Sequence, residues 1–206
     1  MMEHIRQVVF DLGGVLVDLD AERCRAALTR IGLERIAAIV DPCYPAEMIG
    51  RMERGNATFH ETCEEIRRAS GVADVSDEAI GEAYNALVVG IPPEKLRQIE
   101  ALRRRGIRTY VLSNNNPNSM RRIRRLFEVD GHPMEYYFDK IYLSYELREL
   151  KPSETIFRKM IADSGMNPAE TLFIDDGRRN VDMARELGFN VYMPAPYEDF
   201  GHLFEE

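Results

Sequence analysis

The sequence predicts an α/β fold in which a parallel sheet carries helices on both faces. Short apolar segments alternate with helical segments from residue 94 to the end of the chain. This alternation is typical of parallel sheets, because parallel neighbours are joined by crossover helices. Two further observations complete the prediction: an apolar strand near the start, and a helical block at 19–91 that is too long for a simple connection.

The expected strands are short segments rich in β-branched and aromatic residues, which suit a covered, pleated surface. The first one ends just before two glycines, where the backbone can turn sharply. Strands are expected at 8–10, 107–112, 137–144, 171–174 and 189–193. Because the first strand belongs to the same sheet as the others, the helical block interrupts one domain.

The helices between these strands are indicated by apolar residues at helical spacing and by their end signals. Gly106, Gly165 and Gly188 each follow a helical segment, and glycine is the residue that most often ends a helix. Helices are expected at 94–105, 119–127, 154–164 and 181–187.

The helical block shows no strand-like alternation. Asp20 is placed to cap a helix over 21–40, and Thr58 with Glu61 has the spacing of a capping box. Further helices are expected at 46–54, 58–69 and 76–89. The chain is therefore expected to comprise a Rossmann-like α/β core domain, 1–18 with 92–206, and an inserted all-helical cap domain, 19–91.

Composition restricts the classes of function. The 206 residues are 45% hydrophobic and 30% charged, as in ordinary globular proteins, and the net charge of −8 argues against a general nucleic-acid surface. No apolar run approaches the roughly 18 residues of a membrane helix, and the start lacks the apolar core of a signal peptide. We expect a cytoplasmic protein that binds neither membrane nor nucleic acid, as a monomer or a dimer. Cys24, Cys43 and Cys63 are expected to be reduced and structural.

Polar residues stand where three of the expected strands end, and a lysine opens a helix beside them. They are Asp11, Ser113, Asn114, Lys151, Asp175 and Asp176. Because the carboxyl ends of parallel strands converge on one crevice, we expect these side chains to lie together. Three carboxylates repel one another unless a cation lies among them, and a few oxygen ligands suit Mg²⁺.

The lysine and the hydroxyl would bind the remaining oxygens of a phosphate. The chemistry that fits is phosphoryl transfer, in which an Asp carboxylate attacks and forms an aspartyl-phosphate. Each motif alone also has an ordinary structural explanation, such as a polar loop at 113–117 or a turn with a helix cap at 175–177. The order of all four motifs along the chain is far more specific than any one of them.

These motifs resemble those of the haloacid dehalogenase-like (HAD) hydrolases, over essentially the whole chain. The matching segments, in order, are 10–18, 112–114, 151–152 and 174–177 with Asn180. The chain is most similar to the branch of bacterial sugar phosphatases that includes glucose-1-phosphate phosphatases. The helical block is placed like the C1-type cap of this family, which closes over the active site.

The resemblance implies a role for each matching residue. Asp11 would be the nucleophile and a ligand of Mg²⁺, while Ser113 and Lys151 would hold the phosphoryl group and Asn114 would help to bind the substrate. The other metal contacts would be the Gly13 carbonyl, Asp176 and, in support, Asp175, with Asn180 orienting them. The implied activity is Mg²⁺-dependent hydrolysis of a small phosphorylated metabolite, such as a sugar phosphate, through an aspartyl-phosphate.

Gly13 departs from the family pattern. Most phosphatases of the family carry an Asp there, which protonates the leaving group and later activates water. Glycine still offers its carbonyl to the metal, but it cannot transfer a proton, and such transfer is worth about 10²–10⁴-fold in rate. An activated leaving group, a residue of the cap or a bound water are the candidates to compensate.

Two other functions stay open at this point. The loss of the acid at Gly13 favours a non-catalytic or regulatory protein that keeps the fold and the ion. A 2-haloacid dehalogenase uses the same nucleophile on carbon and needs no second Asp, but it has no use for the Asp175 and Asp176 metal site.

Substrate choice is expected to lie in the cap and the loops that face it. The candidates are Arg51, Arg54, His60 and the basic run 121–125. A basic run is also typical of a solvated helix face, and single histidines such as His60 and His132 are usually structural.

Overall fold

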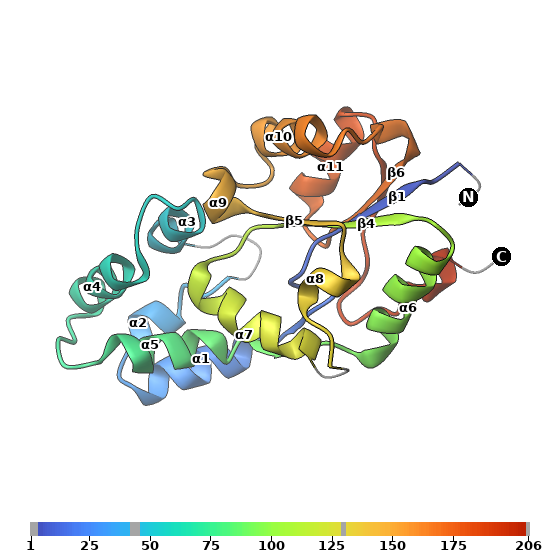
Figure 1. Ribbon diagram of the computed structural model, residues 1–206. Coiled ribbons are helices and arrows are strands. Elements are labelled where there is room, and N and C mark those ends of the chain that lie inside the picture. Colours follow the sequence, from blue (N-terminus) through green and yellow to red (C-terminus); the bar gives the residue numbers. More distant parts are fainter. Residues whose placement is uncertain (1–3, 42–45, 129–130, 205–206) are drawn as a thin grey trace.

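A five-stranded sheet forms the centre of the computed structural model, which describes residues 4–41, 46–128 and 131–204 (Figure 1). The strand order is β5-β4-β1-β6-β7, and every neighbouring pair is parallel. The strands are β1 (Gln7–Phe10), β4 (Arg108–Ser113), β5 (Lys140–Leu143), β6 (Thr171–Ile174) and β7 (Asn190–Tyr192). The predicted parallel α/β sheet is confirmed.

Helices cover both faces of this sheet. Side chains alternate across a strand, so Val8 and Phe10 of β1 face one layer while Val9 faces the other. The first layer contains α6 (Pro93–Arg104), α7 (Pro117–Phe127) and α8 (Met134–Tyr137). The second layer contains α10 (Glu154–Ser164) and α11 (Arg178–Glu186), on the opposite side of the sheet in Figure 1.

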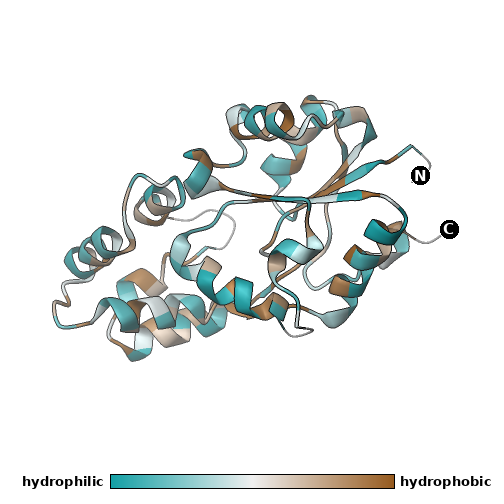
Figure 2. Ribbon diagram, viewed as in Figure 1, coloured by the Kyte–Doolittle hydropathy of each residue, from teal (hydrophilic) through white to brown (hydrophobic). Residues whose placement is uncertain are grey.

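The cap has a hydrophobic cluster of its own, formed by buried residues between Cys24 and Leu87. Its helices are α1 (Ala21–Arg30), α2 (Glu34–Ala37), α3 (Glu47–Glu53), α4 (Phe59–Ser70) and α5 (Asp77–Asn85). Helices of both parts carry hydrophobic and hydrophilic residues in alternation (Figure 2), as expected where one face of a helix is buried. Cys24 and Cys63 are buried free thiols, and Cys43 lies outside the described residues.

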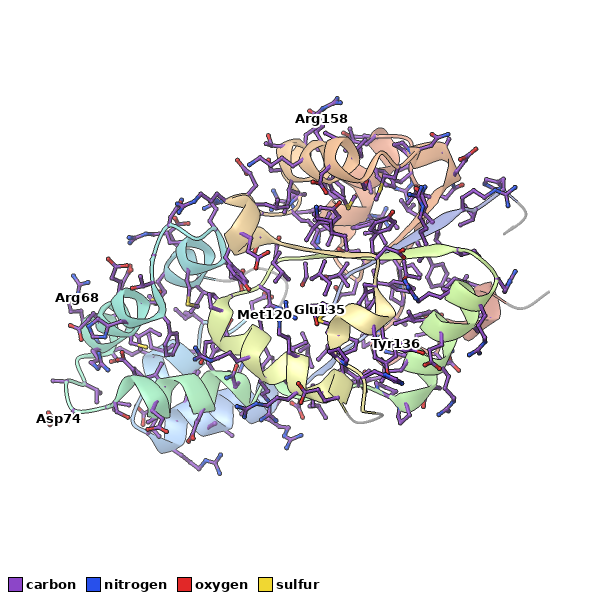
Figure 3. All side chains as sticks on the ribbon, in the orientation of Figure 1. Arg68, Asp74, Met120, Glu135, Tyr136 and Arg158 are labelled. Atoms are coloured by element: carbon purple, nitrogen blue, oxygen red, sulfur yellow. The ribbon has the colours of Figure 1, made fainter. Side chains whose placement is uncertain are left out.

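The same division between interior and surface is visible for single side chains. Met120 of α7 points inward and is 2% exposed, whereas Arg68, Asp74 and Arg158 project from the surface (Figure 3). Within the described part of the chain, no helix has the length and apolar character needed to cross a membrane.

The expected end signals are confirmed where the sequence marks them most clearly. Asp20 accepts hydrogen bonds from two backbone N–H groups at the start of α1. Thr58 and Glu61 form both bonds of a capping box. Gly165 adopts the left-handed conformation, with φ +66°, directly after α10. Short 3₁₀ turns lie at Pro168–Glu170 and Gly201–Leu203.

Two predictions for the cap were wrong. The single helix expected over 21–40 is interrupted after α1, because Gly32 adopts a left-handed φ of +81° that a helix cannot contain. The block also contains strands: β2 (Asp18–Leu19) pairs antiparallel with β3 (Val88–Gly90). The chain passes between core and cap twice at this place, and the two passages pair as a short ribbon.

The third expected strand was also too long. Only the four residues of β5 pair in the sheet, between α8 and the short helix α9 (Ser144–Leu147). The β-like composition of 137–144 reflects burial rather than extension, because Tyr137 is a fully buried helical residue.

Candidate active site

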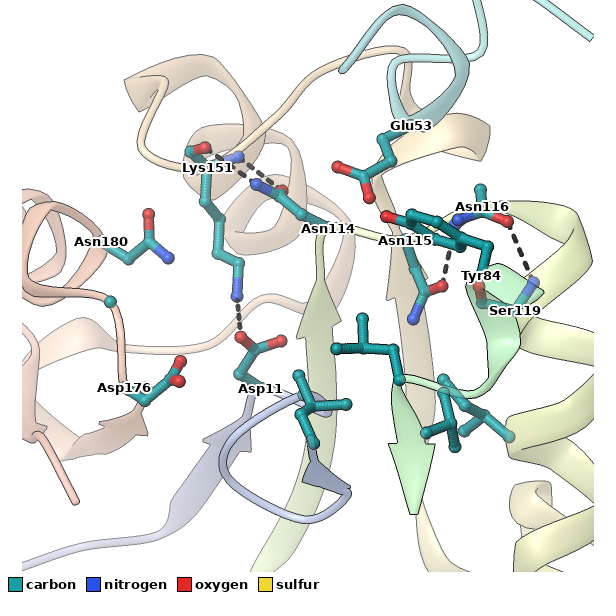
Figure 4. Close-up of a pocket in the computed structure, with 16 residues that line it drawn as sticks. Asp11, Glu53, Tyr84, Asn114, Asn115, Asn116, Ser119, Lys151, Asp176 and Asn180 are labelled. Atoms are coloured by element: carbon teal, nitrogen blue, oxygen red, sulfur yellow. Dashed lines mark hydrogen bonds and ion pairs between the residues drawn. The ribbon is translucent and has the colours of Figure 1, made fainter. Parts of the chain in front are cut away.

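The carboxyl ends of β1, β4 and β6 meet at one edge of the sheet. Phe10 pairs with Val111 on one side and with Ile174 on the other, so Asp11 emerges between the two neighbouring strands. A cavity of about 100 Å³ opens at this edge, between the core and the cap. Its polar lining includes Asp11, Glu53, Tyr84, Asn115, Lys151 and Asp176 (Figure 4).

Lys151 joins two of the predicted carboxylates. Its Nζ lies 3.1 Å from Oδ2 of Asp11 and 2.6 Å from Oδ2 of Asp175, and its side chain is fully buried. Burial lowers the pKa of Lys151, but the attraction of the two carboxylates outweighs it and the net pKa is raised. Lys151 is therefore a permanent cation at the floor of the cavity.

The carboxylates themselves lie close enough to share a cation. Ligand oxygens of Asp11, Asp175 and Asp176 all lie within 4.8 Å of one another. Burial raises the pKa of Asp11 to about 7, although Lys151 opposes it, and burial together with Asp175 raises that of Asp176 to about 6. Ionising these groups is unfavourable without a compensating charge, which a divalent cation supplies.

Asp175 is the most constrained of the three. Its Oδ2 accepts from Lys151, and its Oδ1 accepts from the Gly177 N–H at 2.8 Å and from Nδ2 of Asn180 at 2.9 Å. It is fully buried and its oxygens already have partners, whereas Asp176 lines the cavity. This arrangement fits a supporting position for Asp175 and a direct metal contact for Asp176.

The glycine pair after β1 allows this close approach. A Cβ at Gly14 would lie 2.0 Å from Oδ2 of Asp176, and Gly14 also has a left-handed φ of +74°. At Gly13 an added Cβ would meet only the flexible Leu19 side chain, at 2.9 Å. Carboxylate oxygens with a nearby backbone carbonyl are a donor set that suits Mg²⁺, so the residues present fit this ion.

The motif after β4 contributes in a different way from the one expected. Oδ1 of Asn114 accepts from the Lys151 N–H at 2.8 Å, and its Nδ2 donates to the Lys151 carbonyl at 3.0 Å. Asn114 thus holds the backbone of the lysine, and substrate binding by Asn114 stays a prediction. Ser113 is buried, is not among the described residues that line the cavity, and donates weakly to the Asn114 carbonyl at 3.4 Å.

Sequence reasoning missed the residues that the cap brings to the cavity, Glu53 and Tyr84. Glu53 is the last residue of α3 and is buried, and its carboxyl lies beside Tyr84 in Figure 4, across from Asp176. Burial, with a smaller effect of Asp11, raises the pKa of Glu53 to about 7. Burial also raises the pKa of Tyr84 well above its usual value.

A signal for Glu53 was present in the sequence. Ile49 and Met52 are the buried apolar residues of α3, and position 53 lies four residues after the first of them, on the same face. A carboxylate on the apolar face of a helix breaks the expected pattern, and such breaks are typical of functional positions.

The other cap candidates lie apart from the lining. Arg51 is exposed and pairs with Glu65 at 3.2 Å. His60 is exposed and pairs with Asp77 at 2.7 Å. Arg54 lines an adjoining hollow that shares Asn114 and Lys151 with the main cavity.

The basic run belongs to α7, whose buried side is Met120, Ile123 and Phe127. Arg121, Arg122 and Arg125 are exposed, as a solvated helix face requires, and the choice between such a face and an anion site stays a prediction. His132 is exposed and stacks on Tyr136, with ring centroids 3.9 Å apart.

The chain is similar in sequence to known proteins over nearly its whole length. A family model described as haloacid dehalogenase-like hydrolase matches residues 5–188. The chain is 34% identical over 197 residues to a D-ribitol-5-phosphate phosphatase from Bacteroides thetaiotaomicron, and the match covers 95% of each protein.

Solved structures agree with this match. A HAD family enzyme from Bacteroides thetaiotaomicron, in complex with magnesium and inorganic phosphate, is 37% identical, with a TM-score of 0.90 over 98% of this chain and 100% of that one. A predicted HAD-like family hydrolase from Porphyromonas gingivalis is 36% identical, with a TM-score of 0.89 over 98% and 99%. An L-2-haloacid dehalogenase from Xanthobacter autotrophicus, 20% identical with a TM-score of 0.66 over 96% and 80%, shares the fold.

Proposed function

The chain belongs to the haloacid dehalogenase-like hydrolase family, and we propose that it is a Mg²⁺-dependent phosphatase acting on a small polyol or sugar phosphate. The observation that carries this proposal is Lys151 buried between Asp11 and Asp175, with Asp176 beside them in the lining of the cavity. One cation and three carboxylates in this arrangement suit a phosphate held with a divalent metal.

In the proposed reaction, Asp11 attacks phosphorus, the bond from phosphorus to the alcohol oxygen breaks, and an aspartyl-phosphate forms on Asp11. Water then attacks this intermediate and releases inorganic phosphate, which regenerates the carboxylate. Lys151 holds a phosphoryl oxygen during both steps, and a rotation of the Ser113 hydroxyl would add a second donor. Asn114 keeps Lys151 in place through its two backbone bonds.

Mg²⁺ would be held by Asp11, Asp176 and the Gly13 carbonyl, with Asp175 in support. When bound, the ion supplies charge that offsets the negative phosphoryl oxygens. The raised pKa values of Asp11 and Asp176 support this assignment, because the metal-free site has too little positive charge for its carboxylates.

The alternatives are less well supported. A non-catalytic role is not favoured, since a relative that matches over nearly the whole chain is a named phosphatase. The similarity to the dehalogenase is a similarity of fold. The three-carboxylate cluster suits a metal ion, which halide displacement does not need.

The test is phosphate release from D-ribitol 5-phosphate and a panel of sugar phosphates, with and without Mg²⁺. We expect Mg²⁺-dependent hydrolysis that is lost in Asp11→Asn, because an amide cannot act as the nucleophile. Asp182→Asn, a half-buried position on α11 that is not among the described residues lining the cavity, serves as the control and should keep wild-type activity. Hydrolysis that survives Asp11→Asn would contradict the proposal, as would inactivity of the wild type on the whole panel.

We further propose that residues 1–18 and 92–206 form the catalytic core and that 19–91 form a cap domain in a cytoplasmic enzyme. The separate hydrophobic cluster of the cap supports this division, because each part buries apolar surface of its own. The cavity lies between the two parts, so the cap is placed to select the alcohol portion of the substrate.

A further inference from the structure

Hydrolysis of an alkyl phosphate requires a proton for the departing oxygen, since an alkoxide is a poor leaving group. The position two residues after Asp11 cannot supply it, because it is Gly13. Among the described residues, five titratable side chains line the cavity: Asp11, Glu53, Tyr84, Lys151 and Asp176. The proton donor is to be sought among them.

Three of the five are committed to other tasks under the proposed function. Asp11 is the nucleophile, and Asp176 is a metal ligand. Lys151 stays protonated between two carboxylates, so it cannot deliver a proton and recover it. Tyr84, with a pKa well above its usual value, is too weak an acid to suit proton donation in the first step, because a general acid works best with a pKa near the operating pH. Glu53 remains.

The surroundings of Glu53 suit proton transfer. Its carboxyl faces the cavity from the cap side, and no hydrogen bond within the described chain engages it, although the residue is only 8% exposed. Buried carboxyl groups ordinarily have hydrogen-bond partners, so an unengaged one that lines a cavity is available to a ligand.

The backbone of Glu53 is tied to the catalytic edge of the core. The Ser144 hydroxyl lies 2.6 Å from the Glu53 carbonyl, to which it donates, and accepts from the Asn115 N–H at 3.0 Å. Ser144 is fully buried at the start of α9, and Asn115 belongs to the loop after β4. The cap residue is therefore held at a set position relative to the core, as a proton donor must be.

We propose that Glu53 is the general acid and base of this enzyme, acting from the cap in place of the side chain that Gly13 lacks. This inference rests on the proposed phosphatase function. In the first step the Glu53 carboxyl gives its proton to the alcohol oxygen as the phosphorus–oxygen bond breaks, leaving the alcohol and a carboxylate. In the second step that carboxylate takes a proton from the water that attacks phosphorus, while the bond from phosphorus to Asp11 breaks. A pKa of about 7 at Glu53 agrees with both tasks.

The test compares two substrates that differ in their need for a proton. D-Ribitol 5-phosphate releases an alkoxide, whereas p-nitrophenyl phosphate releases a stable phenolate without protonation. In Glu53→Gln we expect single-turnover cleavage of the polyol ester to fall by about 10²–10⁴-fold. Release of p-nitrophenolate in the first turnover should fall by less than about tenfold, because this leaving group departs without general-acid catalysis.

A second readout follows from the role of Glu53 as a base. With p-nitrophenyl phosphate, Glu53→Gln should accumulate the aspartyl-phosphate. The intermediate is detected as a burst of p-nitrophenolate equal to the enzyme concentration and, with radioactively labelled phosphate, as acid-stable label on the protein. Glu53→Asp retains a carboxyl and should recover part of the lost rate. Glu78→Gln, an exposed position of the cap, is the matched control and should behave as the wild type.

The outcomes separate the inference from the function on which it rests. A wild type that hydrolyses neither substrate overturns both. An active wild type with equal losses on the two substrates in Glu53→Gln, or with no loss, leaves the phosphatase standing and overturns the role of Glu53. A folded Glu53→Gln, shown by a thermal transition no lower than that of the wild type, excludes misfolding as the cause of a loss.

Discussion

The two sides of the cavity differ in how far their polar groups are already satisfied. On the core side, Lys151 contacts Asp11 and Asp175, and Asp175 accepts two further bonds. On the cap side, the Glu53 carboxyl is buried, and it has no hydrogen-bond partner among the described residues. The core side is preorganised before any substrate arrives, whereas the cap side keeps a group unsatisfied until a ligand enters.

Stability and function are opposed on the cap side of the cavity but not on the core side. A satisfied charge network supports the fold and orients the phosphate at the same time. An unsatisfied buried carboxyl makes the free protein less stable, and the proton transfer proposed for Glu53 would give this unfavourable group a use in the reaction. Three further predictions follow from the comparison.

The largest effect is expected at Lys151. Lys151→Met should lower the free energy of unfolding of the metal-free protein by about 3–5 kcal/mol, because it leaves buried carboxylates without their cation. The control is Lys140→Met, whose Nζ lies at the same 2.6 Å from Asp163 as that of Lys151 from Asp175, but on the surface. This exposed pair should contribute only about 0–1 kcal/mol. Urea unfolding measures both, and equal losses would contradict the distinction drawn from burial.

The next effect concerns the two glycines after β1. Gly14→Ala should reduce Mg²⁺-dependent activity by about 10²-fold, because a Cβ there lies 2.0 Å from Oδ2 of Asp176 and displaces a metal ligand. Gly13→Ala meets the flexible Leu19 side chain instead and should cost much less. Steady-state rates at saturating and limiting Mg²⁺ provide the measurement. A Gly14→Ala enzyme with normal Mg²⁺ dependence would show that Asp176 is not constrained in this way.

A smaller effect is expected on the pH dependence of stability. The pKa of Glu53 rises from 4.5 to about 7 in the folded state, so the folded state binds more protons than the unfolded state between these values. The stability that depends on a neutral Glu53 is complete below about pH 4.5 and is lost as pH rises through about 7. Glu53→Gln should therefore be more stable than the wild type at pH 8, on the order of 2 kcal/mol, and equal to it at pH 4.

Urea unfolding of the metal-free proteins at the two pH values measures this difference, with Glu78→Gln as the exposed control. A gain that is the same at both pH values would assign the effect to packing rather than to ionisation. A gain confined to pH 8, taken with the kinetic test, would show that the Glu53 carboxyl is unfavourable for the fold and required for the reaction.

Most of the fold could be predicted from local patterns. The alternation of strands and helices gave the parallel sheet, because period and end signals are local properties of the chain. The ribbon of β2 and β3 could not be predicted in this way. A strand of two or three residues has no period to detect, and it exists because two passages of the chain lie side by side.

The core half of the site followed from the same reasoning. Asp11, Lys151, Asp175 and Asp176 come together as expected, since strand ends in a parallel sheet share one edge. The partners of Asn114 could not be anticipated, because its amide bonds to a backbone segment 37 residues away.

The family, the parallel sheet and the carboxylates at its edge follow from the sequence alone, because each depends on short motifs in a fixed order. The sequence also showed, at Gly13, that a proton donor is missing from its expected place. Only the tertiary structure brought Glu53 to the cavity, 42 positions after Asp11 and on the other side of it. The apolar face of α3 marks Glu53 as unusual among the carboxylates of the cap, but its chemistry comes from burial and from the loop that it faces.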